Sequence, residues 1–232
     1  MSEGILTETE FDGKLKECEI YQKHPQLLPF IGKNYGNGKF NKLLIIGESH
    51  YISNTYLAGE NKGNDRKKEE LKYIFENWYE ISNSDLNNEE CNDIGWTTTR
   101  KTITGSEARF NKRVRSALNN LSEDLFSCIS FMNFFQRPAS LKTSINSDEK
   151  DIKIANETLQ FVCDIIRPDC LLFLSKKSKD NFVGKSENFP DKEKIAVVYH
   201  PTAWRWKKNH PVYGKQVFID FIKNNVIKEA QK

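Results

Sequence analysis

Four short apolar runs divide the chain, and each of them predicts a buried β-strand. The runs are residues 42–47 (KLLIIG), 125–132 (LFSCISFM), 170–174 (CLLFL) and 195–199 (IAVVY). They are continuously apolar rather than alternating, which is typical of parallel strands that are covered on both faces. Helical patterns lie between them, and this alternation indicates the α/β class. We therefore expect a three-layer α/β/α sandwich around a central four-stranded parallel sheet.

The segments between these runs show the three- and four-residue spacing of amphipathic helices. One such helix is expected to end before Arg167-Pro168, because the residue that precedes a proline disfavours helical backbone. The expected helices cover residues 9–22, 71–78, 110–121, 152–166, 176–183 and 217–222.

The length of 232 residues fits a single domain over 1–232. We expect its core over 42–225 and an N-terminal extension over 1–40, where prolines and glycines favour loops. No apolar run reaches the roughly 18–20 residues that a membrane span needs. The N-terminal residues also lack the apolar region of a secretory signal. These patterns predict a cytoplasmic protein that has no membrane partner.

Cysteines and two of the histidines give little sign of a metal site. The five cysteines are irregularly spaced and form no CxxC, which argues against a disulfide framework, a zinc ribbon and an iron–sulfur cluster. Cys128, Cys163 and Cys170 lie in apolar runs, where packing is expected. His24 and His210 lie in polar stretches beside prolines and are expected at the surface. We expect a monomer without a metal or other cofactor.

The net charge of +3 conceals an uneven distribution. Six basic residues and one acid lie between residues 95 and 120, and four basic residues and no acid lie between 201 and 215. The stretch 60–93 compensates with ten acids and five bases. Two basic segments favour one anion-binding face, while the alternative is two solvated surfaces.

Polar residues follow all four predicted strands, and those after the third are Ser175, Lys176 and Lys177. Glu48, Ser49 and His50 follow the first strand, Asn133 the second, and His200 the fourth. Ligands of parallel sheets bind beyond the carboxyl ends of the strands. We therefore expect the side chains of Glu48, His50, Asn133 and His200 to converge in one cleft.

Several kinds of chemistry fit these residues. Glu48, His50 and His200 supply groups for proton transfer near neutral pH, and the same groups could instead ligate Zn or Mn. In a structural alternative, Glu48 caps a helix and His200 bonds a backbone carbonyl. The Asn133 amide could read a base edge or cap the next element. The common motifs of dinucleotide, P-loop, elbow-serine and zincin sites are missing from the sequence.

Aromatic and basic residues alternate directly after His200-Pro201, in the segment WRWKK. Aromatic rings stack on bases or wedge between them, and Lys and Arg pair with phosphates. The alternative is one core tryptophan in a solvated loop. The residues expected to bind nucleic acid are Arg100, Lys101, Arg137, Trp204, Arg205, Lys207 and Lys208.

The residues at the strand ends resemble the motifs of the uracil-DNA glycosylase superfamily. The family motif after strand one reads GQDPYH or GEAPG, and the segment 47–51 here reads GESHY. The family's uracil-reading Asn ends strand two, as Asn133 does, and its HPSPLS motif is similar to His200-Pro201-Thr202. The resemblance covers residues 42–225 and implies a sheet of four parallel strands between helices.

The resemblance implies a DNA glycosylase that flips a nucleotide and hydrolyses the N-glycosidic bond of uracil or another deaminated or damaged base. The implied partner is DNA, either single-stranded or lesion-containing. The implied catalytic residues are Glu48, His50 and His200, and the implied base-binding residues are Tyr51, Asn133 and Ser49.

This sequence departs from the family motifs at several positions. Ser49 stands at the water-activating Asp of GQDPYH, so that Glu48 would have to act in its place. His50 replaces the Pro of both motifs, and Trp204 is the candidate substitute for the intercalating Leu of HPSPLS. A second hypothesis is therefore a catalytically altered relative, which binds a nucleotide or single-stranded nucleic acid without excising a base.

Overall fold

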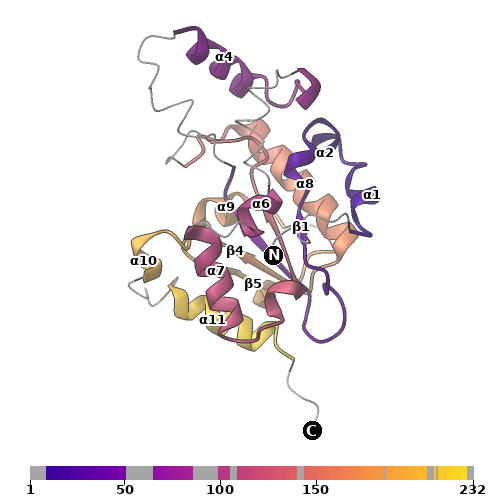
Figure 1. Cartoon of the computed structure of the whole chain (residues 1–232), viewed down its shortest axis with the longest axis vertical. Helices are drawn as coiled ribbons and strands as arrows, with labels where there is room; N and C mark the ends of the chain where they lie inside the picture. Colours follow the sequence, from indigo (N-terminus) through magenta and orange to yellow (C-terminus); the bar gives the residue numbers. More distant parts are fainter. Residues whose placement is uncertain are drawn as a thin grey trace.

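The computed structural model describes residues 9–50, 65–85, 99–104, 109–139, 144–184, 187–207, 212 and 214–228. Within these ranges the chain forms a five-stranded sheet with helices on both faces (Figure 1), which confirms the α/β class. The strands are β1 (Phe30–Ile31), β2 (Leu43–Gly47), β3 (Ile129–Asn133), β4 (Cys170–Phe173) and β5 (Ile195–Val197).

The sheet is mixed rather than purely parallel. Its strand order is β1-β3-β2-β4-β5, and β2 to β5 run parallel while β1 pairs antiparallel with β3. The expectation of four parallel strands alone is therefore wrong, because a fifth strand stands at the edge. With two residues, β1 is too short to produce a recognisable periodic pattern.

The second predicted strand begins later than expected. Leu125–Cys128 form a 3₁₀ turn, and the strand itself spans Ile129–Asn133. The Ser127 hydroxyl donates to the Asp124 carbonyl at 2.7 Å, and such local bonds favour turns over strands. The shift makes Asn133 the last residue of β3, opposite Gly47 of β2.

The described helices agree with most of the predicted ranges. The predicted helix at 9–22 is instead two short helices, separated by a turn at residues 16–18. Arg167 ends the longest helix in a left-handed conformation with φ 45°, directly before Pro168. The helices are α1 (Asp12–Leu15), α2 (Glu19–Lys23), α4 (Asp65–Glu76), α6 (Thr99–Thr104), α7 (Arg109–Asn119), α8 (Glu149–Ile166), α9 (Lys176–Asn181), α10 (Trp204–Lys207) and α11 (Lys215–Asn225).

Two hydrophobic cores lie on the two faces of the sheet. Successive residues of β2 point to opposite faces, so Leu44 and Ile46 pack with α8 while Leu43 and Ile45 pack with α7 and α11. In Figure 1, α8 lies with α1 and α2 on one side and α7 lies with α11 on the other. The predicted N-terminal extension takes part in the first core, where Leu15 is fully buried.

The strand order reverses beside β2, where a crevice is expected beyond the carboxyl ends of the strands. The chain passes from β2 to β3 on one side and later crosses to β4 on the other side. In parallel sheets such a reversal separates the loops at the carboxyl ends and marks the usual ligand site. The segments that follow β2 and β4, residues 48–50 and 174–175, border this crevice.

Two predictions about composition can be compared with the structure. Cys128, Cys163 and Cys170 are buried free thiols, which confirms that they serve packing. Burial raises the pKa of the Cys170 thiol to about 11. Across the described ranges, every helix is too short or too polar to cross a bilayer.

Candidate functional site

Glu48 is the first side chain after β2, and its carboxylate reaches across the crevice. Oε2 accepts a hydrogen bond from Ser175 Oγ at 2.6 Å, directly beyond β4. Oε1 accepts from Ser144 Oγ at 2.5 Å and from the Ile145 N–H at 3.3 Å. At α9 the N-cap residue is Ser175 and not Glu48, whose carboxylate instead accepts the hydrogen bond of the Ser175 hydroxyl. Two serines and one backbone amide thus fix the carboxylate at the switch point of the sheet.

Asn133 and His50 form a buried pair beside Glu48. The side chains are 5% and 2% exposed, and Asn133 Nδ2 lies 3.3 Å from His50 Nε2. Because the amide nitrogen only donates, Nε2 accepts in this pair. Gly47 makes room for the arrangement, since a Cβ at that position would lie 2.2 Å from Asn133 Oδ1. Glycine is therefore the residue that lets the Asn133 amide lie across the end of β2.

Backbone hydrogen bonds hold the segments after β2 and β3 side by side. The Phe135 N–H donates to the Glu48 carbonyl at 2.9 Å, and the Ala139 N–H donates to the His50 carbonyl at 2.7 Å. These bonds extend the pairing of β2 and β3 beyond the ends of both strands. The positions of Glu48, His50 and Asn133 are therefore coupled to one another through the main chain.

His200 follows β5 and stacks on Phe110 of α7, with ring centroids 5.1 Å apart. Its Nδ1 accepts the Thr202 N–H at 3.3 Å and lies 2.7 Å from Thr202 Oγ1. A neutral ring that accepts at Nδ1 carries its proton on Nε2. Nε2 has no hydrogen-bond partner among the residues that the structure describes. His200 thus presents a donor that is available to a ligand.

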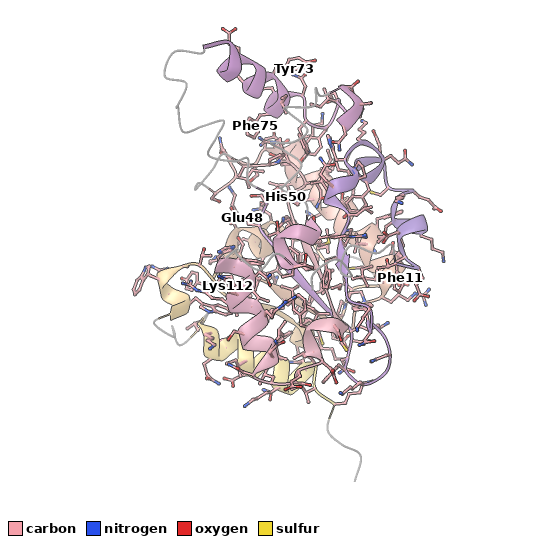
Figure 2. All side chains as sticks on the ribbon, viewed as in Figure 1. Phe11, Glu48, His50, Tyr73, Phe75 and Lys112 are labelled. Carbon is pink, nitrogen blue, oxygen red and sulfur yellow. The ribbon has the colours of Figure 1, made fainter. Side chains whose placement is uncertain are left out.

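The surroundings of His200 keep its ring uncharged. The pKa of His200 is lowered to about 4, mainly by burial; the Glu48 carboxylate partly opposes this shift, and the Arg113 guanidinium adds to it. Both charges therefore lie near enough to act on the ring. Figure 2 shows Glu48 and His50 close together, with Lys112 on the α7 side below them.

Ser49 and Tyr51 are the other two predicted base-binding residues. Ser49 is 5% exposed, and its Oγ has no hydrogen-bond partner among the described residues. Tyr51 lies outside the described residues.

Arg100 and Arg137 serve the fold, which corrects their predicted role in nucleic-acid binding. Arg100 donates to Asp12 at 2.7 Å and to the Pro29 carbonyl at 3.0 Å. Arg137 donates to both carboxylate oxygens of the buried Asp151, at 2.9 and 2.5 Å. Their side chains are 14% and 17% exposed, so neither guanidinium is available to a phosphate.

The segment after His200 divides its two tryptophans between core and surface. Trp206 is 3% exposed and packs against Phe218, whereas Trp204 is 66% exposed. Arg205 donates to the Tyr199 hydroxyl at 2.6 Å and lies 5.9 Å from the ring of Trp204. The side chains of Lys101 and Lys207 and the whole of Lys208 lie outside the described residues.

His24 is buried, so the prediction that it lies at the surface is wrong. Its ring stacks on Trp78 with centroids 3.9 Å apart. Nε2 lies 2.9 Å from the Trp78 carbonyl and Nδ1 lies 3.2 Å from Asn83 Oδ1. The polar sequence around His24 gave no sign of these partners, which lie more than fifty residues away.

The metal alternative finds no matching geometry. Within the described ranges, His, Cys, Asp and Glu side chains nowhere gather in a group of three that could hold a metal ion. Sequence reasoning also assigned no role to Ser144, Ser175, Phe110 or Arg113. Ser175 follows a predicted strand and Arg113 lies in the basic stretch between residues 95 and 120, so both could have been found by position, whereas Ser144 and Phe110 offer no local signal of a site.

No protein-family model matches the sequence, and no curated protein matches it. Function must therefore be inferred from the arrangement of these side chains.

Proposed function

We propose that this protein is a DNA glycosylase, which hydrolyses the N-glycosidic bond of uracil or another deaminated or damaged base. The proposal rests on the neutral, half-buried His200, whose available Nε2–H lies within electrostatic reach of the Glu48 carboxylate. The resemblance of the strand-end segments to the uracil-DNA glycosylase superfamily supports the same reaction.

His200 would act on the leaving base. When the bond between C1′ and the base nitrogen breaks, its electron pair goes to the base and the sugar becomes oxocarbenium-like. A fixed donor that faces the developing negative charge stabilises the transition state, and an imidazole with a lowered pKa donates a hydrogen bond while keeping its proton. The contacts of Thr202 with Nδ1 fix the ring, so Nε2–H is already placed as a donor before the bond breaks.

Glu48 would act on the sugar and on water. A carboxylate oxygen accepts about two hydrogen bonds, so Oε1 is filled by Ser144 and Ile145, while among the described residues Oε2 accepts only from Ser175 and has room for one more donor. A water held at that position can attack C1′, and its proton is taken up as the new bond forms. The negative charge also stabilises the cationic sugar.

Asn133 would read the base. One of its N–H groups pairs with His50, which fixes the plane of the amide. Its oxygen and second N–H have no hydrogen-bond partner among the described residues, and together they match a base edge that carries a neighbouring donor and acceptor.

The direct test is release of free base under single-turnover conditions. Oligonucleotides that contain uracil, hypoxanthine or xanthine are incubated with excess enzyme, both as single strands and as duplexes. We expect release from at least one of them. An absence of release from all of them contradicts the proposal.

A second candidate function is a non-excising relative that binds nucleotides or single strands. The position of the water-activating Asp holds the buried Ser49, whose hydroxyl has no hydrogen-bond partner among the described residues and supplies no carboxylate. In that case the same oligonucleotides bind with strong salt dependence, but no base is released.

A further inference from the structure

A groove of about 560 Å³ opens between α7, α10 and α11. Lys112, Arg113 and Ser116 of α7 form one wall, and Lys215 and Gln216 of α11 form the other. The largely buried Trp206 of α10 contributes an apolar surface between the walls. Two helices far apart in the sequence therefore build one concave site.

The groove is positively charged. Three of its lining residues are cations, and the lining contributed by the described residues contains no acid. Within the described part of the chain, no acidic side chain forms an ion pair with Lys112 or Lys215. The first turns of α7 and α11 also contain no acid, although the helix dipole favours one there. The arrangement leaves positive charge that an anion would neutralise.

The groove adjoins the candidate site. Arg113 donates a hydrogen bond to the Pro201 carbonyl, next to His200. The same helix carries Phe110, on which the His200 ring stacks. One rigid element therefore forms both the wall of the His200 site and the wall of the groove. A ligand bound at His200 can therefore extend into the groove.

We infer that the groove binds phosphate groups in the backbone of the nucleic-acid strand whose target base enters the site. This inference rests on the proposed function, because it takes the occupant of the site to be part of a strand. The cations stand on two opposed walls, which suits successive phosphates better than one. The exposed Trp204 and Arg205 on the neighbouring α10 supply a stacking surface for bases of the same strand.

The test compares two double variants of equal net charge. Lys112→Gln/Lys215→Gln removes both unpaired lysines of the groove. Lys153→Gln/Lys223→Gln is the matched control, because both lysines are exposed and lie outside the groove. Binding of a fluorescent, undamaged single strand of thymidylates is measured by anisotropy over a range of salt concentrations, after thermal unfolding has shown that both variants fold.

We expect the groove variant to bind about tenfold more weakly at low salt, and the slope of log K against log salt to decrease by about 1.4, or about 0.7 for each lost contact. The control should bind as the wild type does. Equal losses in both variants, or no loss in either, overturn the inference. Displacement of the strand by thymidine monophosphate or inorganic phosphate at an equal phosphate concentration also overturns it, because the groove would then serve a free anion.

The base-release assay separates this inference from the proposed function. If no base is released while the groove variant alone loses binding, the glycosylase proposal fails and the groove still binds a strand. If base is released while both variants bind equally, the glycosylase proposal stands and the inference about the groove fails.

Discussion

His24 and His200 each stack on an aromatic ring, but their surroundings leave the ring nitrogens in opposite situations. Both nitrogens of His24 have protein partners, in Trp78 and Asn83, and the side chain is fully buried. Among the described residues, His200 has hydrogen-bond partners only at Nδ1, in Thr202, and none at Nε2. Burial lowers the pKa of both rings. The comparison teaches that an unfilled hydrogen-bond position, rather than a shifted pKa, distinguishes a candidate functional histidine from a structural one.

The largest effect expected from this comparison is on chemistry at His200. His200→Ala should slow single-turnover base release by about 100- to 1000-fold, which is typical of the loss of one preorganised donor. The free energy of unfolding should change by less than about 1 kcal/mol, because the ring is half-buried and donates no hydrogen bond to the described residues. Release that continues at the wild-type rate would remove His200 from the mechanism.

His24→Ala should have the opposite effects, with a large loss of stability and little change in base release. Removing a fully buried ring leaves a cavity and takes a hydrogen-bond partner from the buried Trp78 carbonyl, so the free energy of unfolding should decrease by about 2–4 kcal/mol in urea titrations. Base release at a temperature where the variant remains folded should be within about twofold of wild type. A loss of release as large as that of His200→Ala would show that the two histidines are not distinguished by their contacts.

Gly47→Ala tests the close approach of the Asn133 amide to the end of β2. The added Cβ would lie 2.2 Å from Asn133 Oδ1 and would displace the amide. We expect about 1–3 kcal/mol of destabilisation and a weaker discrimination between accepted bases. Gly13→Ala in α1 is the control, because nothing lies within 4 Å of its Cβ. Its stability should remain equal or increase slightly, as a helical alanine allows.

A further effect is expected on the pH dependence of stability and rate. The pKa of His200 is about 4 in the folded protein and near the usual 6.5 in the unfolded chain. The unfolded chain therefore binds more protons between these values, so stability is present above about pH 6.5 and is lost as the pH falls toward 4. Base release that depends on neutral His200 should be constant down to about pH 5. Titration of the imidazole signals by NMR checks this, and a His200 that titrates near 6.5 would contradict it.

The sequence predicted those features that depend on local pattern. Continuous apolar runs located β2 and β4 almost to the residue, and the position after a strand identified Glu48, Asn133 and His200. The edge strand β1 was missed, since two residues carry no periodicity. The roles of Arg100 and Arg137 were also mistaken, because a charge in the sequence does not reveal the carboxylate that pairs with it in the fold.

The hydrogen bonds that shape the site could not be predicted from the sequence either, because only the fold brings their partners together. The hydrogen bonds from Ser144 and Ser175 to Glu48 join segments about a hundred residues apart. The pairing of Asn133 with His50 depends on the register between β2 and β3 and on the space that Gly47 leaves. Such properties arise from tertiary packing and have no counterpart in spacing along the chain.

The order of the strands has a consequence for how a ligand acts on the whole molecule. Glu48 follows the central strand β2, while His200 follows the last strand, β5, at one edge of the sheet. A ligand that contacts both residues would connect the end of the central strand with the end of the edge strand. Its binding energy would then oppose unfolding of the entire sheet rather than of one loop. Occupancy of the site should therefore appear as a cooperative increase in the melting temperature, which offers a screen for the preferred base before any bond is cleaved.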